Sequence, residues 1–382
     1  MQNTSSPGST PRLRLFEPPF DRYTEQAVAQ VISTGQVMQG PLVERLEAEV
    51  AKYLQVPDPE RVVATSSGYS ALELAMSFTP RKGYRVLVPA MTMIATLEAV
   101  VRAGLVPKLV DVGPDLQVNT DIIEAALDPQ VGGVVAVDFG GRQPNMRALK
   151  DLCYDKDLML WEDAAHAFGS RSHGELAGTL SDLACFSLHP IKPLPALGGG
   201  LLVNNIPDQP YLHVQPRRAR YYGIQDREGP MYNVKHLGQN AYMTDVSAAV
   251  ALQFLPRIEL LNQRRRTLAG IYHEALEEAG IRDEVKPLPY DVGSTYHLFT
   301  VLCSGPLARA KLHDALEQQG IETGYHYQPL HRFTACLKYP AGDLPNADNF
   351  GSRVLQLPCH PRMSDADVVR VVEALKGALA KD

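Results

Sequence analysis

The sequence predicts an α/β protein in which a mainly parallel, seven-stranded sheet lies between helices and is followed by a smaller α+β unit. From about residue 60, short runs rich in strand-forming residues alternate with amphipathic segments, which is typical of a parallel sheet covered on both faces. The chain has 382 residues, so it is too long for one simple core and fits two or three domains.

Seven short apolar runs are the predicted strands, and amphipathic segments such as 70–77 and 146–153 lie between them. In chain order the strands cover residues 62–64, 85–88, 108–112, 134–138, 158–162, 184–187 and 201–203. Ahead of the sheet, apolar residues at helical spacing predict a helix from Leu42 to Leu54, and an earlier helix is expected to end at Gly35.

The pattern changes after the predicted sheet. Residues 204–243 lack clear periodicity, and we expect a loop region there, which in a compact protein is usually functional or forms contacts. The elements expected next are a long helix from about Asp245, a strand near 298–302, a helix near 306–319 and a final helix after Ser364. The expected domains are a disordered lead-in (1–12), a large domain (13–255) and a small C-terminal α+β domain (256–382).

The composition is that of an ordinary soluble globular protein, with 45% hydrophobic and 21% charged residues. Acidic and basic residues are interleaved, and the net charge of -6 gives no indication of a nucleic-acid partner or a membrane surface. No apolar segment approaches the roughly 20 residues needed to cross a bilayer, and the N-terminus does not resemble a signal peptide. We therefore expect a cytoplasmic protein.

The five cysteines do not indicate a disulfide framework or a zinc site, because their number is odd and no two of them form a CxxC pair. His326 and His331 could suggest a metal only on a helix, and Pro329 between them argues against one. We therefore expect buried thiols and no metal.

Polar side chains follow several predicted strands, and ligands of an open parallel sheet bind beyond the carboxyl ends of its strands. The first such segment is Ser66-Ser67-Gly68-Tyr69-Ser70, which follows a strand and opens a helix. Small residues let backbone N–H groups approach an anion, and the dipole of a helix N-terminus favours negative charge. A serine that only caps the helix explains the same residues, so both interpretations stay open.

Two further segments carry charged groups at strand ends. Glu162 and Asp163 end an apolar strand, where a carboxylate is either a helix cap or a fixed counter-charge for a cationic ligand. Lys192 stands among apolar residues and prolines and precedes three glycines, residues 198–200. A lone lysine is usually a surface residue, but these glycines allow close approach to a ligand, and a desolvated lysine can act as a Schiff-base nucleophile.

These segments resemble the DegT/DnrJ/StrS sugar aminotransferases, which are aspartate-aminotransferase-like, fold-type I enzymes that use pyridoxal 5′-phosphate (PLP). The resemblance extends from about residue 16 to residue 379, and the order and spacing of its blocks make it specific. The blocks are residues 34–41, 162–169, 186–200, 238–243, 297–299, 326–327 and 357–361. The resemblance implies the aspartate-aminotransferase-like fold with a smaller C-terminal α+β domain, PLP as the cofactor, and transamination.

Position by position, the resemblance also implies roles for individual residues. Lys192 would form the Schiff base with PLP, and Asp163 would pair with the protonated pyridine nitrogen, which makes the ring an electron sink. His166 matches a position near the phenolic oxygen of the cofactor. Ser187, with the backbone of the segment Ser67-Gly68-Tyr69, would hold the phosphate. Asn240 matches an asparagine that reaches the phosphate of the neighbouring subunit, so the resemblance implies a homodimer with shared active sites.

Four positions depart from the family pattern. Tyr69 and Pro195 stand where the family usually has threonine, and Gly198 replaces a usual glutamate. Met93 stands at the usually aromatic position that stacks on the cofactor ring, where a thioether covers less area. These changes leave the lysine chemistry in place, and they bear on cofactor affinity and on the identity of the substrate.

Candidate substrate contacts are Arg220, His326 and Tyr327. Arg220 belongs to a basic cluster with Arg217 and Arg218, and such a cluster is either a solvated face or a site for a phosphate or carboxylate.

The expected reaction is a two-stage transamination in which L-glutamate or L-glutamine gives up an amino group, with Lys192 moving the proton. The resemblance implies a nucleotide-linked keto-sugar as the acceptor, with an aminocyclitol ketone as the nearest alternative. A PLP-dependent sugar dehydratase and a non-catalytic PLP-binding protein are the remaining alternatives. Such dehydratases carry histidine at the position of Lys192, and the retention of Lys192, Asp163 and Ser187 disfavours a non-catalytic role.

Overall fold

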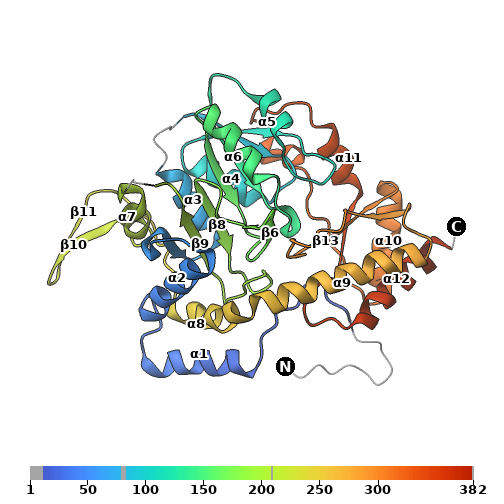
Figure 1. Cartoon of the computed structure of the whole chain (residues 1–382), viewed down its shortest axis with the longest axis horizontal. Coiled ribbons are helices and arrows are strands. Elements are labelled where there is room, and N and C mark those ends of the chain that lie inside the picture. Colours follow the sequence, from blue (N-terminus) through green and yellow to red (C-terminus); the bar gives the residue numbers. More distant parts are fainter. Residues whose placement is uncertain (1–11, 79–82, 208–209, 381–382) are drawn as a thin grey trace.

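The computed structural model describes residues 12–78, 83–207 and 210–380, so the predicted lead-in lies outside the described residues apart from Arg12. Its central feature is one seven-stranded sheet with the strand order β1-β9-β8-β5-β4-β2-β3 (Figure 1). The strands are β1 (Val62–Thr65), β2 (Arg85–Pro89), β3 (Val106–Val110), β4 (Val131–Val137), β5 (Met159–Asp163), β8 (Leu183–Ser187) and β9 (Gly200–Asn204). All seven predicted strands are present, which confirms the predicted α/β fold class.

The sheet is parallel except at β9. β9 runs antiparallel to both β8 and β1, whereas the neighbours β8, β5, β4, β2 and β3 are parallel. Parallel neighbours need a crossover connection, usually a helix. No helix lies between β8 and β9 in the chain, so these two strands can pair only by reversing direction.

Helices cover both faces of the sheet. The α-helices of the described residues are α1 (Arg22–Thr34), α2 (Pro41–Leu54), α3 (Gly68–Ser77), α4 (Ile94–Arg102), α5 (Thr120–Ala126), α6 (Met146–Asp155), α7 (Pro210–Ala219), α8 (Asp245–Phe254), α9 (Ile258–Glu278), α10 (Pro306–Gln318), α11 (Pro345–Arg353) and α12 (Asp365–Leu379). Successive residues of a strand face opposite sides, so Val86 and Val88 pack with α3 and α4, and Leu87 packs with α5 and α6. On the same side as α5 and α6, α2 and α8 cover the half of the sheet formed by β1, β8 and β9.

A second, smaller sheet lies in the C-terminal part of the chain. It consists of the antiparallel strands β12 (Val285–Pro287), β13 (Phe299–Cys303) and β14 (Val354–Leu357). Its core includes apolar residues of α9, α10 and α12, and Figure 1 shows α9 running from α8 toward this unit. Leu13 pairs with Ile321 and belongs to the same core, so the first described residues lie with the C-terminal unit.

The predicted long helix from Asp245 is two helices. α8 ends at Phe254, and a single 3-10 turn (Leu255–Arg257) separates it from α9. Pro256 in this turn has no backbone N–H and disfavours an uninterrupted helix. The predicted domain boundary at residues 255–256 falls on this turn and remains a prediction.

The region 204–243 is more regular than predicted. It contains α7 and the hairpin of β10 (Ile224–Glu228) and β11 (Met231–Val234), which Figure 1 shows projecting from the body of the molecule. All four residues of β11 are exposed. A strand without a buried face needs no alternation of apolar and polar residues, which explains why the sequence pattern missed this hairpin.

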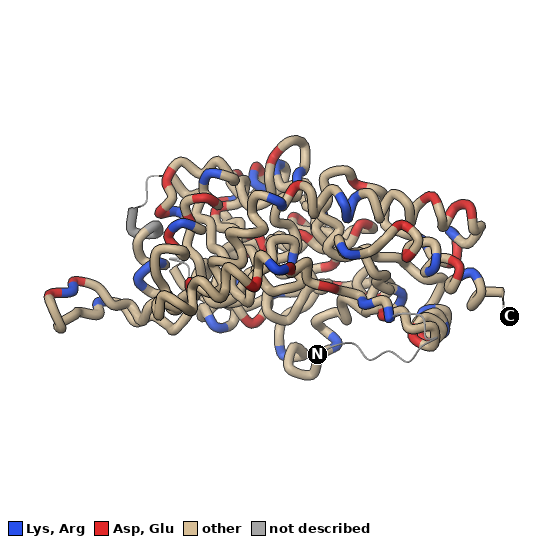
Figure 2. Tube along the Cα trace, turned by 90° about the horizontal axis from the view of Figure 1, so that it is seen from below, with Lys and Arg blue, Asp and Glu red and all other residues tan. Residues whose placement is uncertain are grey.

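Charged residues of both signs alternate along the chain, as Figure 2 shows. Among the described residues, no helix combines the length and the apolar character that a membrane span needs.

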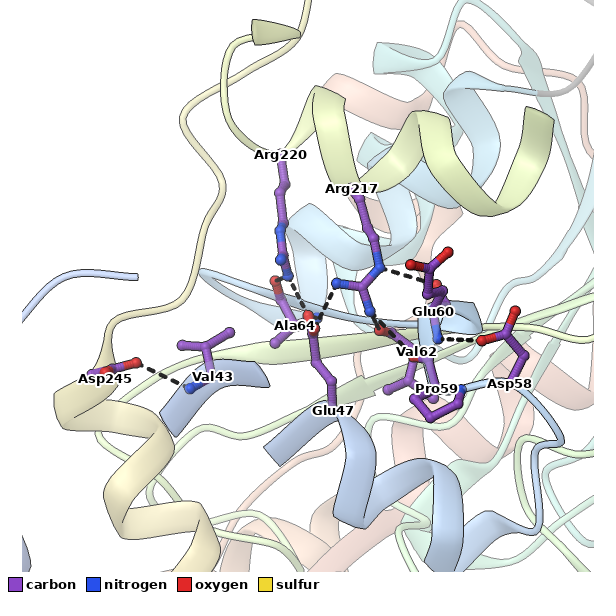
Figure 3. A network of polar contacts seen from close by, with 10 residues as sticks. All are labelled: Val43, Glu47, Asp58, Pro59, Glu60, Val62, Ala64, Arg217, Arg220 and Asp245. Carbon is purple, nitrogen blue, oxygen red and sulfur yellow. Dashed lines mark hydrogen bonds and ion pairs between the residues drawn. The ribbon is translucent and has the colours of Figure 1, made fainter. Parts of the chain in front are cut away.

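Two buried carboxylates tie α2 to its surroundings (Figure 3). Asp245, the first residue of α8, accepts hydrogen bonds from the backbone N–H groups of Gly40 and Val43, each at 3.0 Å. Glu47 of α2 is 1% exposed and forms ion pairs with Arg217, at 2.7 Å, and with Arg220. Ala64 of β1 also donates to Glu47, at 2.8 Å. This network joins α2, β1 and α7 beside the first strand of the sheet.

We expect Glu47→Gln to lower the free energy of unfolding by about 3 kcal/mol or more, because Arg220 would stay buried without a counter-charge. Urea unfolding followed by circular dichroism measures the change. Glu49→Gln on the exposed side of the same helix is the matched control and should stay within about 0.5 kcal/mol of the wild type. Equal unfolding midpoints for both variants would show that the network does not stabilise the fold.

Candidate active site

A cavity of about 220 Å³ lies at the carboxyl edge of the sheet. The strands β1, β4, β5 and β8 end beside it, because parallel strands bring their carboxyl ends to the same edge. Its lining residues are Ser66, Ser67, Gly68, Tyr69, Leu72, Thr92, Met93, Ala95, Val137, Asp163, Ala165, His166, Ser187, His189, Lys192, Gly198, Gly199 and Tyr327. The sequence-predicted site residues that it brings together are Ser67, Gly68, Tyr69, Met93, Asp163, His166, Ser187, Lys192 and Tyr327.

One end of the cavity is formed by the N-terminus of α3. The side chain of Ser67 caps this helix by accepting from the backbone N–H of Ser70 at 3.0 Å, which confirms the helix-cap interpretation. A Cβ on Gly68 would lie 2.8 Å from the Cβ of Ser187, so only glycine lets the helix start meet the end of β8. The first N–H groups of a helix have no partner within the helix. This end of the cavity is therefore suited to an anion.

Asp163 supplies the buried carboxylate, and it is 6% exposed. Its Oδ2 accepts from the hydroxyl of Thr96 at 2.7 Å, and its Oδ1 accepts from the backbone N–H of Ala165 at 3.2 Å. Burial raises the pKa of Asp163, and these two hydrogen bonds and the charge of Lys192 act in the opposite direction. A cation at this carboxylate would therefore find an acceptor that is already fixed in position.

Lys192 lies in the loop between β8 and β9 and is 9% exposed. Burial lowers the pKa of Lys192 to about 8, while the charge of Asp163 opposes this shift. A substantial share of this amine is therefore neutral near physiological pH, which a lysine needs in order to act as a nucleophile or base. Gly198 and Gly199 follow with φ of +102° and +140°, a backbone conformation that favours glycine.

His166 and Tyr327 form a hydrogen-bonded pair at the cavity. The backbone N–H of Gly140 donates to Nδ1 of His166 at 3.2 Å. Burial lowers the pKa of His166 well below its usual range, so the ring is neutral and its one proton is on Nε2. This N–H then donates to the hydroxyl of Tyr327, 3.2 Å away.

Three predicted site residues lie outside this lining. His326 precedes the lining residue Tyr327 in the chain. The two rings meet edge-on, with 5.1 Å between their centroids. Asn240 is exposed and pairs in an isolated bridge with Tyr221. Arg220 is 3% exposed, and its guanidinium donates to Glu47 and to the backbone oxygen of Ala64. The ion pair with Glu47 occupies Arg220, so we do not retain it as a substrate contact.

Sequence reasoning missed two residues that touch the central pair. Thr96 contacts Asp163, and His297 lies beside Lys192 with 3.5 Å between Nζ and Nε2. His297 lies in block 297–299 of the family resemblance, but the sequence analysis gave it no function. Nothing in the sequence connects Thr96 to Asp163. Among the described residues, no group of three or more His, Cys, Asp or Glu side chains could hold a metal ion.

Solved structures of three aminotransferases are similar to the chain over almost its whole length. Aminotransferase TlmJ from Streptoalloteichus hindustanus is 28% identical with a TM-score of 0.90, and the match covers 97% of this chain and 100% of that chain. DesV from S. venezuelae is 31% identical with a TM-score of 0.84, covering 96% and 98%. Spr1654 from Streptococcus pneumoniae, described as a sugar aminotransferase and solved in its PLP form, is 24% identical with a TM-score of 0.88, covering 98% of this chain and 99% of that chain.

The fold and the sequence family define the class of the protein, a PLP-dependent aminotransferase. The sequence model of the DegT/DnrJ/EryC1/StrS aminotransferase family matches residues 20–376. The chain belongs to that family, which confirms the resemblance seen in the sequence.

The cavity fits PLP on observations of this structure alone. The start of α3, residues 66–69, lines the cavity, and a helix N-terminus suits a phosphate. A buried carboxylate at Asp163 suits a protonated ring nitrogen, and the pKa of about 8 gives Lys192 a reactive amine. These three features meet in one cavity.

We expect Gly68→Ala to weaken the binding of PLP and of inorganic phosphate about tenfold or more, because the added methyl group must displace Ser187, and a lost hydrogen bond to a charged group costs about 1.5–3 kcal/mol. Titration of the cofactor-free protein with each ligand measures the loss. Gly377→Ala in α12 is the control, since nothing lies within 4 Å of a Cβ there. Unchanged phosphate affinity in Gly68→Ala would mean that the anion does not bind at the start of α3.

Proposed function

We propose that the protein transfers the amino group of L-glutamate or L-glutamine to the ketone of a nucleotide-linked sugar. The observation that carries the proposal is the placement of Lys192, whose buried amine lies in one cavity with Asp163 and the anion-binding end of α3. Family membership supports the aminotransferase reaction, and the solved neighbour Spr1654 described as a sugar aminotransferase supports a sugar as the acceptor.

PLP, when bound, supplies an electron sink for the charge left when a proton leaves an adjacent carbon. Lys192 would attach the cofactor and, once its amine is free, would remove that proton and return it. A pKa of about 8 suits both tasks, because the amine can exist as base and as acid near neutral pH. No other lysine lines the described part of the cavity.

The remaining residues would hold and orient the cofactor. Asp163, fixed by Thr96, would pair with the ring nitrogen and keep it protonated. His166 would lie near the phenolic oxygen, with Tyr327 fixing its ring through the hydrogen bond at Nε2. Ser187 and the segment Ser67-Gly68-Tyr69 would hold the phosphate. Met93 is 50% exposed where it borders the cavity, and it would cover the ring in place of the usual aromatic side chain.

The proposal is tested in two stages that together predict a complete amino transfer. L-glutamate or L-glutamine should convert the bound cofactor to its amine form, with loss of its visible absorbance. Nucleotide-linked keto-sugars should then restore the absorbance. Lys192→Ala should fail in both stages, whereas the exposed control Lys150→Ala should match the wild type.

Several outcomes would overturn parts of this proposal. If only aminocyclitol ketones restore the absorbance, the acceptor class is wrong. If no amino donor bleaches it, the protein binds PLP without transamination. Cofactor attached to another lysine after borohydride reduction would remove the role of Lys192.

We further propose a homodimer in which Asn240 of one subunit reaches the phosphate in the other. Asn240 is exposed and absent from the cavity of its own chain. It follows the projecting hairpin, whose Met231 and Tyr232 are 70% and 57% exposed. Large apolar side chains exposed together are typical of a contact surface.

Subunit mixing tests this arrangement. An inactive Lys192→Ala subunit mixed with an Asn240→Asp subunit should regain activity, because a hybrid dimer contains one site with both residues intact. Asn240→Asp alone should bind PLP weakly, since the added carboxylate repels phosphate. A fully active monomer, or mixtures no better than their parents despite proven subunit exchange, would rule out a shared site.

A further inference from the structure

The amine of Lys192 has one hydrogen-bonding partner among the side chains that the structure describes. Nε2 of His297 lies 3.5 Å from Nζ of Lys192, and both residues are buried. The two residues come from different parts of the fold. Lys192 follows β8 of the large sheet, whereas His297 stands just before β13 of the C-terminal unit.

The ring of His297 is held from two sides. Phe16 stacks on it with a centroid distance of 5.3 Å and an interplanar angle of 20°. The ring of His166 lies 4.5 Å away on a tilted plane. The adjoining backbone is also fixed, because the N–H of Leu298 donates to the carbonyl of Gly140 at 3.2 Å. A ring fixed in this way holds its nitrogen atoms at defined positions.

The surroundings of His297 keep its ring neutral. Burial lowers the pKa of His297 well below its usual range, and the nearby basic groups of Lys192, His166, Arg265 and His326 act in the same direction. Each of these groups disfavours the charged imidazole. A neutral imidazole has one nitrogen that only accepts, whereas a protonated lysine only donates. When Lys192 is protonated, the hydrogen bond therefore runs from Nζ to Nε2, and the proton of the neutral ring is on Nδ1.

We propose that His297 is a positioning residue for Lys192, whose amine donates a hydrogen bond to Nε2 of the fixed ring and is thereby held in place whenever it is free of the cofactor. An amine that takes up a proton becomes an ammonium group with three N–H bonds, and Nε2 accepts one of them. The ring itself takes no proton in this step. The importance of this contact for catalysis rests on the proposed role of Lys192, whereas the contact itself does not.

The proposal makes the C-terminal unit part of the active site. Thr295 donates through its hydroxyl to the backbone oxygen of His166 at 2.6 Å, and its N–H donates to Gly141 at 3.1 Å. Residues 295–298 are thus bound to the loop that supports His166. The orientation of the Lys192 amine then depends on how the C-terminal unit packs against the part of the chain that contains the large sheet.

Two substitutions distinguish the effect of the hydrogen-bond acceptor from the effect of the stacked ring. His297→Phe keeps a flat ring that can stack on Phe16 but removes the acceptor, and His297→Gln keeps an acceptor near the position of Nε2. Competitive acetylation of the cofactor-free protein across a pH series, read by mass spectrometry, gives the pKa of Lys192. In His297→Phe this pKa should fall by about one unit from its wild-type value, because a hydrogen bond that stabilises the charged amine is lost. In His297→Gln it should stay near the wild-type value.

The kinetics of the loaded enzyme provide the second measurement. For the amino-donor half-reaction, kcat should fall at least tenfold in His297→Phe with little change in KM, and His297→Gln should recover most of the loss. An unchanged Lys192 pKa in His297→Phe, or equal effects of Phe and Gln, would leave His297 a purely structural residue and overturn the proposal. Failure of the keto-sugar assay alone would not affect it, because the acetylation experiment needs neither cofactor nor substrate.

If the His297 variants do not fold, the unchanged ring of His297 still tests the proposal. Nitrogen-15 spectra of histidine-labelled, cofactor-free protein should show a neutral ring with its proton on Nδ1, and its Nε2 signal should change in Lys192→Met. A proton on Nε2 of that ring would contradict the proposal.

Discussion

Lys192 and Asp163 place opposite charges out of water at one edge of the sheet, and the rest of the site depends on keeping them there. An isolated buried charge is costly, so each group must find polar partners inside the protein. Asp163 finds them in Thr96 and the backbone of Ala165. Lys192 finds one in His297. Its pKa of about 8 shows that the charge of Asp163 offsets only part of the lowering caused by burial. The same incomplete offset makes the amine reactive near neutral pH.

These partners come from separate elements, which makes the site a property of the whole fold. Asp163 ends β5, Thr96 lies on α4, and Lys192 follows β8. His297 belongs to the C-terminal unit, whose segment 295–298 is bound to the loop of residues 140–141. Glycine makes two close approaches in this region possible, since a side chain at Gly68 would meet Ser187 and one at Gly141 would meet Thr295.

Whether the sequence predicted an element correctly depended on how far that element is buried. The seven strands were predicted because both faces of the sheet are covered, so each strand is a short apolar run. The hairpin of β10 and β11 was missed because β11 is exposed throughout and β10 buries only Gln225, so neither strand is a short apolar run. Arg220 was predicted as a substrate contact, yet it is bound to Glu47, 173 residues away in the chain. A basic cluster looks the same in sequence whether it meets a ligand or a buried carboxylate.

By itself the sequence determined the fold class, because strand periodicity is a local property of the chain, and the family, through the resemblance of its motif blocks in order and spacing. It also placed Asp163 and Ser187 at strand ends and Lys192 in the segment after one. It could not determine which neutral side chains support them. Thr96 and His297 reach Asp163 and Lys192 across 67 and 105 residues, and nothing near them in the chain indicates these contacts. Only the tertiary structure decides such pairs, since the distance between two side chains depends on how separate helices and strands pack together.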